Sequence, residues 1–406
     1  MDLLSDAKAL EPEMTRLRHD VHKQPEIGLD LPRTQERILS ALESLPLEIT
    51  LGKTSTSVTA VLEGTAPAMS GQDTRSVLLR SDMDALPIDE AADVPYRSER
   101  PGVMHACGHD MHVAMLVGAA RLLAAHRDRL KGKVVFMFQP GEEGWDGAQH
   151  MVDEGVLTAA GRQVDAAYAL HVFSSLAHNG VFTHKGGLVL SASDELHVTV
   201  TGVGGHGSMP HRSKDPISIA AEMVHALETM ITKRFDAFDP VVISVGLFQA
   251  GTKANVIPDT AHFEATVRSY SPEARERLRT LSVQLIEGIA HAHGVTVDAR
   301  YVDQYPITVN DESEASFAAT TAIDLFGEDK NMHLARPLNG SEDFSRVLAH
   351  VPGAFIGLGA MPVGGDPSTA PYNHSALATF DDGVLPMGAA FNAQLALRRL
   401  DQLATL

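Results

Sequence analysis

The sequence predicts an α/β protein into which a second, smaller domain is inserted, and three observations lead to this prediction. Short apolar runs alternate with helical stretches in the first part of the chain, as expected for buried strands joined by helices. Between about residues 189 and 304 the predicted order becomes β-α-β-β-α-β, which is typical of a ferredoxin-like domain. From residue 305 the first pattern resumes, so we expect residues 1–188 and 305–406 to form one domain around the insertion.

The composition fits a chain of two domains and argues against several classes of partner. The 406 residues are enough for two hydrophobic cores. With 33 Lys and Arg against 52 Asp and Glu, the net charge of −19 argues against nucleic acids and anionic membranes. We expect no signal peptide, and no apolar run approaches the roughly 20 residues of a membrane span. The single cysteine excludes a disulfide framework, so we expect a reducing, cytoplasmic location.

The first 47 residues are predicted to form two helices, over Leu3–Lys23 and Thr34–Leu45, with a break between them that contains proline and glycine. Polar residues gather near the end of the first helix. We expect His22 to lie on a solvated helix face, and Arg18 and His19 to brace a functional site from behind.

Buried strands are predicted where the chain has short apolar runs. These runs are Val58–Leu62, Val77–Arg80, Val134–Phe138 and Tyr168–Val172. Polar residues follow directly at their carboxyl ends, where α/β sheets place their chemistry. Those residues include Asp82, Asp84, Glu142, Glu143 and His171. Because several strand ends supply ligand-type side chains, we predict a functional site at this edge of the sheet.

The segment His105-Ala106-Cys107-Gly108-His109-Asp110 contains the only cysteine of the chain. Cys107 and His109 have the spacing and chemistry of metal ligands, and Gly108 gives the backbone freedom to turn both toward one centre. A buried helix is predicted to follow over Met111–His126. The alternative is a small buried cysteine beside histidines that satisfy hydrogen bonds in the core.

The adjacent carboxylates of Glu142 and Glu143 are predicted to have separate roles. Neighbours in an extended segment point to opposite sides, so one would coordinate a metal and the other would act as general base. Alternatively, both acids favour the start of the helix that follows. Asp84 has two readings as well, because it can orient a ligand histidine or cap the turn before Pro87.

The insertion is predicted to contain four strands and two helices. The strands are Asp194–Gly202, Val241–Ala250, His262–Ser269 and Val295–Val302, and the helices are Pro216–Arg234 and Pro272–His293. Its glycine-rich loop at residues 202–208 matches neither a dinucleotide fingerprint nor a P-loop. We expect its polar residues His206, Asn255 and Arg268 to belong to a domain that closes over the metal site, although His206 could equally be an ordinary loop histidine. In the last part of the chain, His374 is either a further metal ligand, contributed from a loop far along the sequence, or a solvent-exposed loop residue.

Eight ordered motifs give the chain a resemblance to a known family. They are Arg18-His19-Asp20 with Pro25-Glu26-Ile27-Gly28, Asp82-Met83-Asp84-Ala85-Leu86-Pro87, His105-Ala106-Cys107-Gly108-His109-Asp110, Gln139-Pro140-Gly141-Glu142-Glu143-Gly144, Gly204-Gly205-His206-Gly207, Ala254-Asn255-Val256-Ile257-Pro258-Asp259, Gly340-Ser341-Glu342-Asp343-Phe344 and Tyr372-Asn373-His374-Ser375-Ala376. Over nearly its whole length the chain resembles the hippurate hydrolase and indole-3-acetyl-amino-acid hydrolase group. This group is the amidohydrolase branch of the aminoacylase and carboxypeptidase-G-type dinuclear metallopeptidases.

The resemblance implies a metallopeptidase-like catalytic domain with a central sheet, and a lid that also forms a homodimer. It implies two divalent ions per subunit, either zinc, manganese, cobalt or nickel, which assist hydrolysis of N-acyl amino acids. The implied metal ligands are Cys107, the bridge between the ions, with His109, Glu143, His171 and His374.

The other implied roles concern catalysis and substrate binding. Glu142 is the implied general base, and His206 of the lid reaches the site of the partner subunit. Asn255 and Arg268 are implied to serve the substrate carboxylate and the oxyanion. Trp145 and Asp146 stand where relatives usually carry glycines, which leaves the preferred substrate open.

Two other classes of function remain. A cysteine hydrolase would use Cys107 as nucleophile and His109 as base, and would need no metal. A non-catalytic binding protein could keep the same fold, but it would have no need for a free carboxylate beside a metal.

Overall fold

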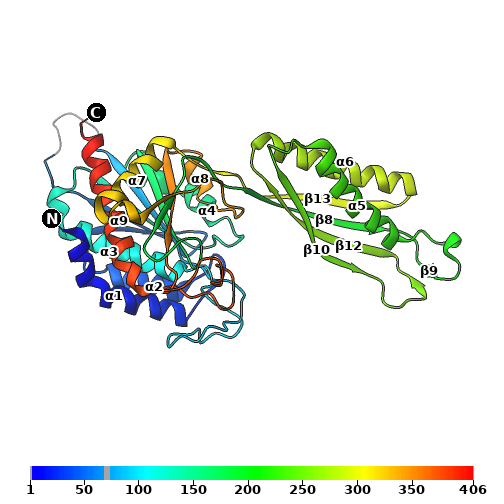
Figure 1. Cartoon of the computed structure of the whole chain (residues 1–406), viewed down its shortest axis with the longest axis horizontal. Helices are drawn as coiled ribbons and strands as arrows, with labels where there is room; N and C mark the ends of the chain where they lie inside the picture. The colour runs from blue at the N-terminus through cyan, green and yellow to red at the C-terminus, as the bar shows by residue number, and fades with distance from the viewer. Residues whose placement is uncertain (1, 68–73, 406) are drawn as a thin grey trace. The chain divides into compact units, whose positions relative to one another are not determined.

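A computed structural model describes residues 2–67 and 74–405, and the chain divides into two compact units. The first unit contains Met1–Val189, Val309–Arg336 and Asp343–Leu406. The second contains Leu190–Thr308 and Pro337–Glu342. Each unit is built around a sheet of its own (Figure 1).

The first unit has an eight-stranded sheet with the strand order β1-β2-β4-β3-β5-β16-β6-β15. Its strands are β1 (Leu47–Leu51), β2 (Val58–Glu63), β3 (Ser76–Asp82), β4 (Lys133–Gln139), β5 (Ala166–Phe173), β6 (Phe182–His184), β15 (Asn331–His333) and β16 (Gly353–Gly359). The four central strands β4, β3, β5 and β16 are parallel to one another, so their carboxyl ends meet at one edge. All four predicted runs are strands of this sheet, which confirms the α/β fold class.

Seven helices belong to the described part of the first unit. They are α1 (Leu3–Lys23), α2 (Pro32–Leu42), α3 (His109–Ala125), α4 (Gly147–Asp153), α7 (Glu312–Phe326), α8 (Ser345–Leu348) and α9 (Leu385–Leu403). The predicted helix over Leu3–Lys23 agrees with α1 at both ends. The second predicted helix begins and ends slightly too late, because the fixed backbone angle of Pro32 already suits the first turn.

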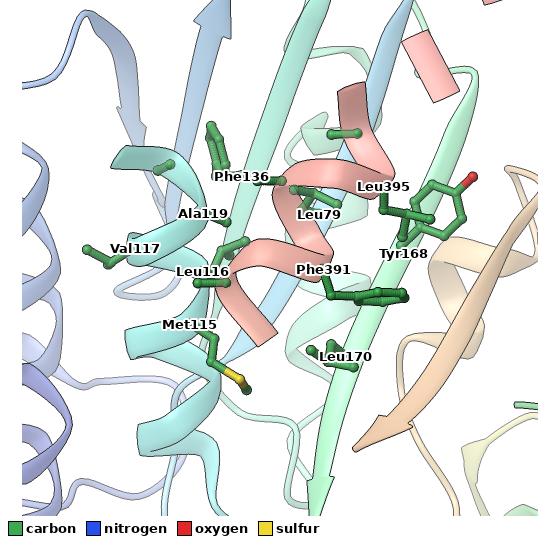
Figure 2. Close-up of a cluster of buried hydrophobic side chains, with 14 of the residues drawn as sticks. Leu79, Met115, Leu116, Val117, Ala119, Phe136, Tyr168, Leu170, Phe391 and Leu395 are labelled. Carbon is green, nitrogen blue, oxygen red and sulfur yellow. The ribbon is translucent and has the colours of Figure 1, made fainter. Parts of the chain in front are cut away.

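The core of the first unit lies between its sheet and two long helices. Helices α3 and α9 pack against each other and against β3. Figure 2 shows side chains of the two helices beside those of the strands, among them Leu79, Met115, Leu116, Phe136, Leu170, Phe391 and Leu395. Most residues of α3 are buried on all faces of the helix, as expected for a helix in the interior of a domain.

A buried cluster of charges ties the strand ends together. The guanidinium of Arg80 donates to Gln139 Oε1 at 2.8 Å, to Asp82 Oδ2 at 2.6 Å and to Asp343 Oδ1 at 3.0 Å. Asp343 also accepts from the backbone N–H of Ala148 in the first turn of α4. Both carboxylates are completely buried, and Arg80 supplies the positive charge that compensates for theirs.

The expectation that His22 faces solvent is wrong. His22 is 2% exposed, and its ring lies 2.9 Å from Asp110 and 3.2 Å from Glu90. Burial opposes protonation, but the two carboxylates raise the pKa of His22 to about 9. Arg18 donates to Asp110 as well, at 3.0 Å. The helix pattern did not predict this because it depends on how α1 packs on α3, which holds Asp110 in its first turn.

The second unit confirms the predicted β-α-β-β-α-β order. Its main elements are β8 (Ala192–Thr201), α5 (Pro216–Arg234), β10 (Val241–Ala250), β12 (Thr260–Ser269), α6 (Pro272–His293) and β13 (Thr296–Tyr305). The strand order β10-β12-β8-β13 is that of a ferredoxin-like sheet. Two short strands, β9 (Gly205–His206) and β11 (Val256–Ile257), pair with each other. The strands β7 (Gly187–Leu190) and β14 (Thr308–Asn310) lie where the chain passes between the units.

Both predicted helices of the insertion agree with α5 and α6 at each end. Within the described ranges, none of the helices is long and apolar enough to cross a membrane.

Candidate metal centre

The turn at Gly108 brings Cys107 and His109 together at the start of α3. Gly108 has a φ of +83°, which side chains rarely tolerate, and a Cβ there would lie 2.5 Å from Val172 Cγ2. A glycine is therefore required between the two residues. Ligand atoms of Cys107, His109 and Glu143 all lie within 4.8 Å of one another.

Backbone carbonyl groups fix the ring orientation of His109 and His171. The Nδ1 atom of His109 lies 2.9 Å from the carbonyl oxygen of Asp84, and that of His171 lies 2.8 Å from the carbonyl oxygen of Val172. Each Nδ1 must donate to its carbonyl, so in the neutral ring, the form that binds a metal, Nε2 carries the lone pair. His109 Nε2 is buried without a hydrogen-bond partner, and His171 Nε2 lies 3.5 Å from Cys107 Sγ. This is how metal-binding histidines are held.

His374 completes the group from a distant part of the chain. Its Nε2 lies 3.1 Å from Glu143 Oε1, although that buried oxygen makes no well-aligned hydrogen bond. The backbone of His374 has a φ of 70°, which is unusual for a residue other than glycine, and its N–H donates to the carbonyl of Ala106. Such backbone strain is characteristic of functional sites. The structure thus brings together all five predicted ligands: Cys107, His109, Glu143, His171 and His374.

The side chains of Glu142 and Glu143 belong to different groups. The carboxylate of Glu143 faces His109 and His374, whereas the carboxylate of Glu142 lies within 4.8 Å of that of Asp343. Both backbone N–H groups donate to the carboxylate of Asp84, each at 3.0 Å. Asp84 therefore orients His109 with its carbonyl group and fixes the two glutamates with its side chain.

The structure also places Asp82 and His112 in this centre. The sequence indicated Asp82 only as one of the polar residues at the strand ends, and it did not indicate His112. Ligand atoms of both lie within 4.8 Å of those of His109 and His171. Both nitrogens of His112 are already used, because Nδ1 lies 2.5 Å from Asp82 Oδ1 and Nε2 accepts from the N–H of Val172. His112 is therefore a support for the centre rather than a ligand. The sequence does contain a signal for this role: His112 follows His109 by three residues, which places both side chains on the same face of a helix.

Asn373 was also missed, although it precedes His374 in a motif. Its side-chain nitrogen donates to the carbonyl groups of Cys107 and Val172, and lies 3.7 Å from Cys107 Sγ. Its oxygen accepts from the N–H of Ser174. Asn373 thus joins the segments that carry Cys107, His171 and His374, and no local sequence pattern indicates this.

The electrostatics of the centre favour a cation. Burial opposes protonation of His109, but Asp82 and Cys107 raise its pKa well above the ordinary value. Burial likewise opposes protonation of His374, while Cys107 and Glu143 raise its pKa to about 10. Negative charge is therefore concentrated where the ligand atoms meet. A thiolate, imidazoles and carboxylates around buried atoms without hydrogen bonds form a donor set that fits divalent metal ions.

The three predicted residues of the second unit lie at opposite ends of its sheet. His206 and Asn255 are neighbours, since Gly207 next to His206 donates to the carbonyl of Asn255. Arg268 pairs with Ser193 at the start of β8, whereas His206 follows the end of this ten-residue strand. A strand of that length spans roughly 30 Å. One small substrate cannot contact both Arg268 and His206 of the same chain within this unit.

Arg268 is a half-buried cation with a neutral partner. Its guanidinium donates to the hydroxyl group of Ser193. No carboxylate of the described chain forms an ion pair with it within 4.0 Å. Burial lowers its pKa, which the nearby Asp194 and Glu195 partly offset. Because its guanidinium has no carboxylate partner among the described residues, Arg268 can donate hydrogen bonds to a carboxylate of a ligand.

Comparison with known proteins agrees with the fold and the centre. The family model of peptidase family M20/M25/M40 matches residues 78–398. The chain is 34% identical to thermostable carboxypeptidase 2 of Saccharolobus solfataricus, with 98% of each chain covered. It is 32% identical to hippurate hydrolase of Campylobacter jejuni, with 98% of this chain and 100% of the relative covered.

A solved structure from Bacillus subtilis, described as a dinuclear metal-binding peptidase of the M20 family, has a TM-score of 0.79 and 30% sequence identity. It covers 97% of this chain and 99% of its own. Together with the buried cluster, this likeness fits two divalent metal ions at the centre. The chain belongs to peptidase family M20/M25/M40.

Proposed function

We propose that the protein hydrolyses the amide bond of N-acyl amino acids, with Glu142 as general base beside a dinuclear metal centre. A metal-dependent amidohydrolase of this substrate class agrees with the family and with the hippurate hydrolase relative. The observation that carries the proposal is the group of Cys107, His109 and Glu143, whose ligand atoms converge while His109 Nε2 and Glu143 Oε1 are buried without a hydrogen-bond partner in the described chain.

Five residues would hold the two ions: Cys107, His109, Glu143, His171 and His374. When bound, two divalent ions lower the pKa of a water molecule and polarise the scissile carbonyl group. Zinc, cobalt, nickel and manganese suit these cysteine, histidine and glutamate ligands to different degrees. The carbonyl groups of Asp84 and Val172 keep the ligand histidines in the tautomer that the centre needs.

Glu142 moves the proton in the proposed mechanism. Its carboxylate accepts the proton of the attacking water and then returns it to the nitrogen of the leaving amino acid. Because Asp84 fixes the backbone of Glu142, the carboxylate needs little reorganisation between these steps. His206 donates a hydrogen bond to the carbonyl oxygen in the transition state, with help from Asn255. Arg268 binds the α-carboxylate of the amino-acid half, which a protein of net charge −19 otherwise repels.

Arg268 and His206 lie at opposite ends of a ten-residue strand, which spans roughly 30 Å, and this placement supports a homodimer. In this arrangement His206 and Asn255 of one subunit serve the site of the other, so neither subunit is complete alone. We place the enzyme in the cytoplasm, because its single cysteine excludes a disulfide framework.

Mixed dimers test the exchange of His206 between subunits. Chains with Glu142→Gln and chains with His206→Ala are each expected to form inactive homodimers. When they are co-expressed, one of the two sites in each mixed dimer keeps Glu142 and receives His206 from its partner, so the separated mixed dimer is expected to have about half of the wild-type activity. The activity of the separated mixed dimer is the measurement. A chain carrying both substitutions, paired with the wild-type chain, is the control and should be inactive, because the site that keeps Glu142 then receives no His206. Mixed dimers without activity would mean that His206 acts in its own chain.

Removal of the metal tests the proposed function directly. Elemental analysis is expected to find about two divalent ions per chain, and exhaustive chelation is expected to abolish hydrolysis of N-acetyl, N-benzoyl and indole-acetyl amino acids. Added zinc, cobalt or manganese should restore it. If metal-free protein kept its activity but lost it on thiol alkylation, Cys107 would be a nucleophile instead. Bound metal without hydrolysis of any such amide would support a binding protein.

A further inference from the structure

Trp145 is the only tryptophan of the chain, and it stands directly after the Glu142-Glu143-Gly144 segment. Its side chain is 52% exposed. The residue lies two positions from Glu143, so the two Cα atoms are at most about 7.6 Å apart. Trp145 is thus on the same short segment as the two glutamates beside which the amide bond of the substrate is proposed to lie.

Two glycines leave room for the indole ring. Gly28 has a φ of +81°, and a Cβ there would lie 3.1 Å from Trp145 Cε2. At Gly141, which has a φ of +73°, a Cβ would lie 3.0 Å from the Cβ of Trp145. The covered part of the ring is therefore packed on the Gly28 turn. The remaining part is open to a ligand.

The loop that carries Trp145 is fixed at several points. Asp146 accepts two hydrogen bonds from the guanidinium of Arg346, at 3.1 and 2.8 Å. Gly147 donates to the carbonyl of Gly141 at 3.0 Å, and the carboxylate of Asp84 holds the start of the loop. Because the loop is already ordered, a ligand that stacks on Trp145 does not have to order it first.

We propose that Trp145 is a specificity-determining residue that stacks against the acyl group of the substrate and favours planar, aromatic acyl groups over acetyl. This inference rests on the proposed function. The amino-acid half of the substrate carries the α-carboxylate that Arg268 binds, so the uncharged acyl half is left for the apolar indole surface. An aromatic acyl group packs on a fixed indole in an offset-stacked or edge-to-face arrangement, whereas an acetyl group covers little of it.

Kinetics with three substrates test which half of the substrate Trp145 contacts. In metal-loaded enzyme, Trp145→Ala is expected to lower kcat/KM for N-benzoylglycine about tenfold, mainly through KM, and to change N-acetylglycine and N-acetylphenylalanine less than twofold. Trp145→Phe should recover most of the loss. The control is Phe238→Ala, because Phe238 is a 98% exposed aromatic residue of the second unit. Equal losses for all three substrates, or a loss confined to N-acetylphenylalanine, would overturn the proposal.

The fluorescence of this single tryptophan gives a second readout that does not depend on turnover. N-benzoylglycine added to metal-loaded Glu142→Gln enzyme is expected to change the emission in a saturable way, and N-acetylglycine should change it far less. Unchanged emission at saturating N-benzoylglycine would also overturn the proposal. If the wild-type enzyme hydrolysed none of these amides, the proposed function would fail, while the fluorescence titration would still test binding at Trp145.

Discussion

Replacing Glu142 by glutamine is expected to lower kcat for N-acyl amino acids about a thousandfold while both metal ions stay bound. Glutamine keeps the size and most of the shape of the side chain, but it cannot accept the proton of the attacking water. The carboxylate of Glu142 lies near that of Asp343 rather than with Cys107 and His109, so its loss removes no ligand. The fold is retained because the backbone N–H of residue 142 still donates to Asp84.

The adjacent Glu143 offers a matched comparison with the same chemical change. Glu143→Gln should lower the metal content as well as the activity, because Glu143 faces His109 and His374. Glu154→Gln, which changes a partly exposed glutamate outside the centre, is the control and should leave both quantities unchanged. Elemental analysis and steady-state kinetics of the three proteins are the measurements. Full activity in Glu142→Gln, or lost metal in that variant alone, would contradict the assigned roles.

Replacing Arg80 by methionine is expected to lower the free energy of unfolding of the first unit by about 3–5 kcal/mol. Arg80 is almost completely buried, and it is hydrogen bonded to the buried carboxylates of Asp82 and Asp343. Methionine fills part of the space but leaves two buried acids without their cation. Because Asp343 also holds the first turn of α4, we expect activity to fall together with stability.

Arg75→Met is the matched control, since it changes the same residue type in a more exposed place. Arg75 is 30% exposed and pairs with Asp165 at 3.0 Å. Such a pair contributes about 1 kcal/mol or less to stability, so the free energy of unfolding of this variant should be close to that of the wild type. Urea denaturation followed by circular dichroism compares the three proteins. If Arg80→Met lowered the free energy of unfolding by less than about 1 kcal/mol, the burial of the two carboxylates would not depend on the charge of Arg80.

Much of the fold could be predicted from the sequence because the relevant signals are local. The helices over 3–23, 216–234 and 272–293 agree with the structure at both ends, since each has a regular apolar face and a proline or polar residue near its start. The segment of Cys107 and His109 was recognisable for a similar reason, because ligand types lie two residues apart around a glycine. The expected solvated position of His22 failed, since its burial depends on contacts with Asp110 and Glu90 far along the chain.

The sequence by itself thus determined the type and order of the elements, the α/β class with its inserted β-α-β-β-α-β domain, and the residue types that gather at the strand ends. Only the tertiary structure decided their geometry. It places His112 beside His109 and His171 and engages both of its ring nitrogens in hydrogen bonds. It also places Arg268 and His206 at opposite ends of one sheet. The physical reason is that these arrangements depend on hydrogen bonds and packing between residues far apart in the chain, which local periodicity and spacing do not encode.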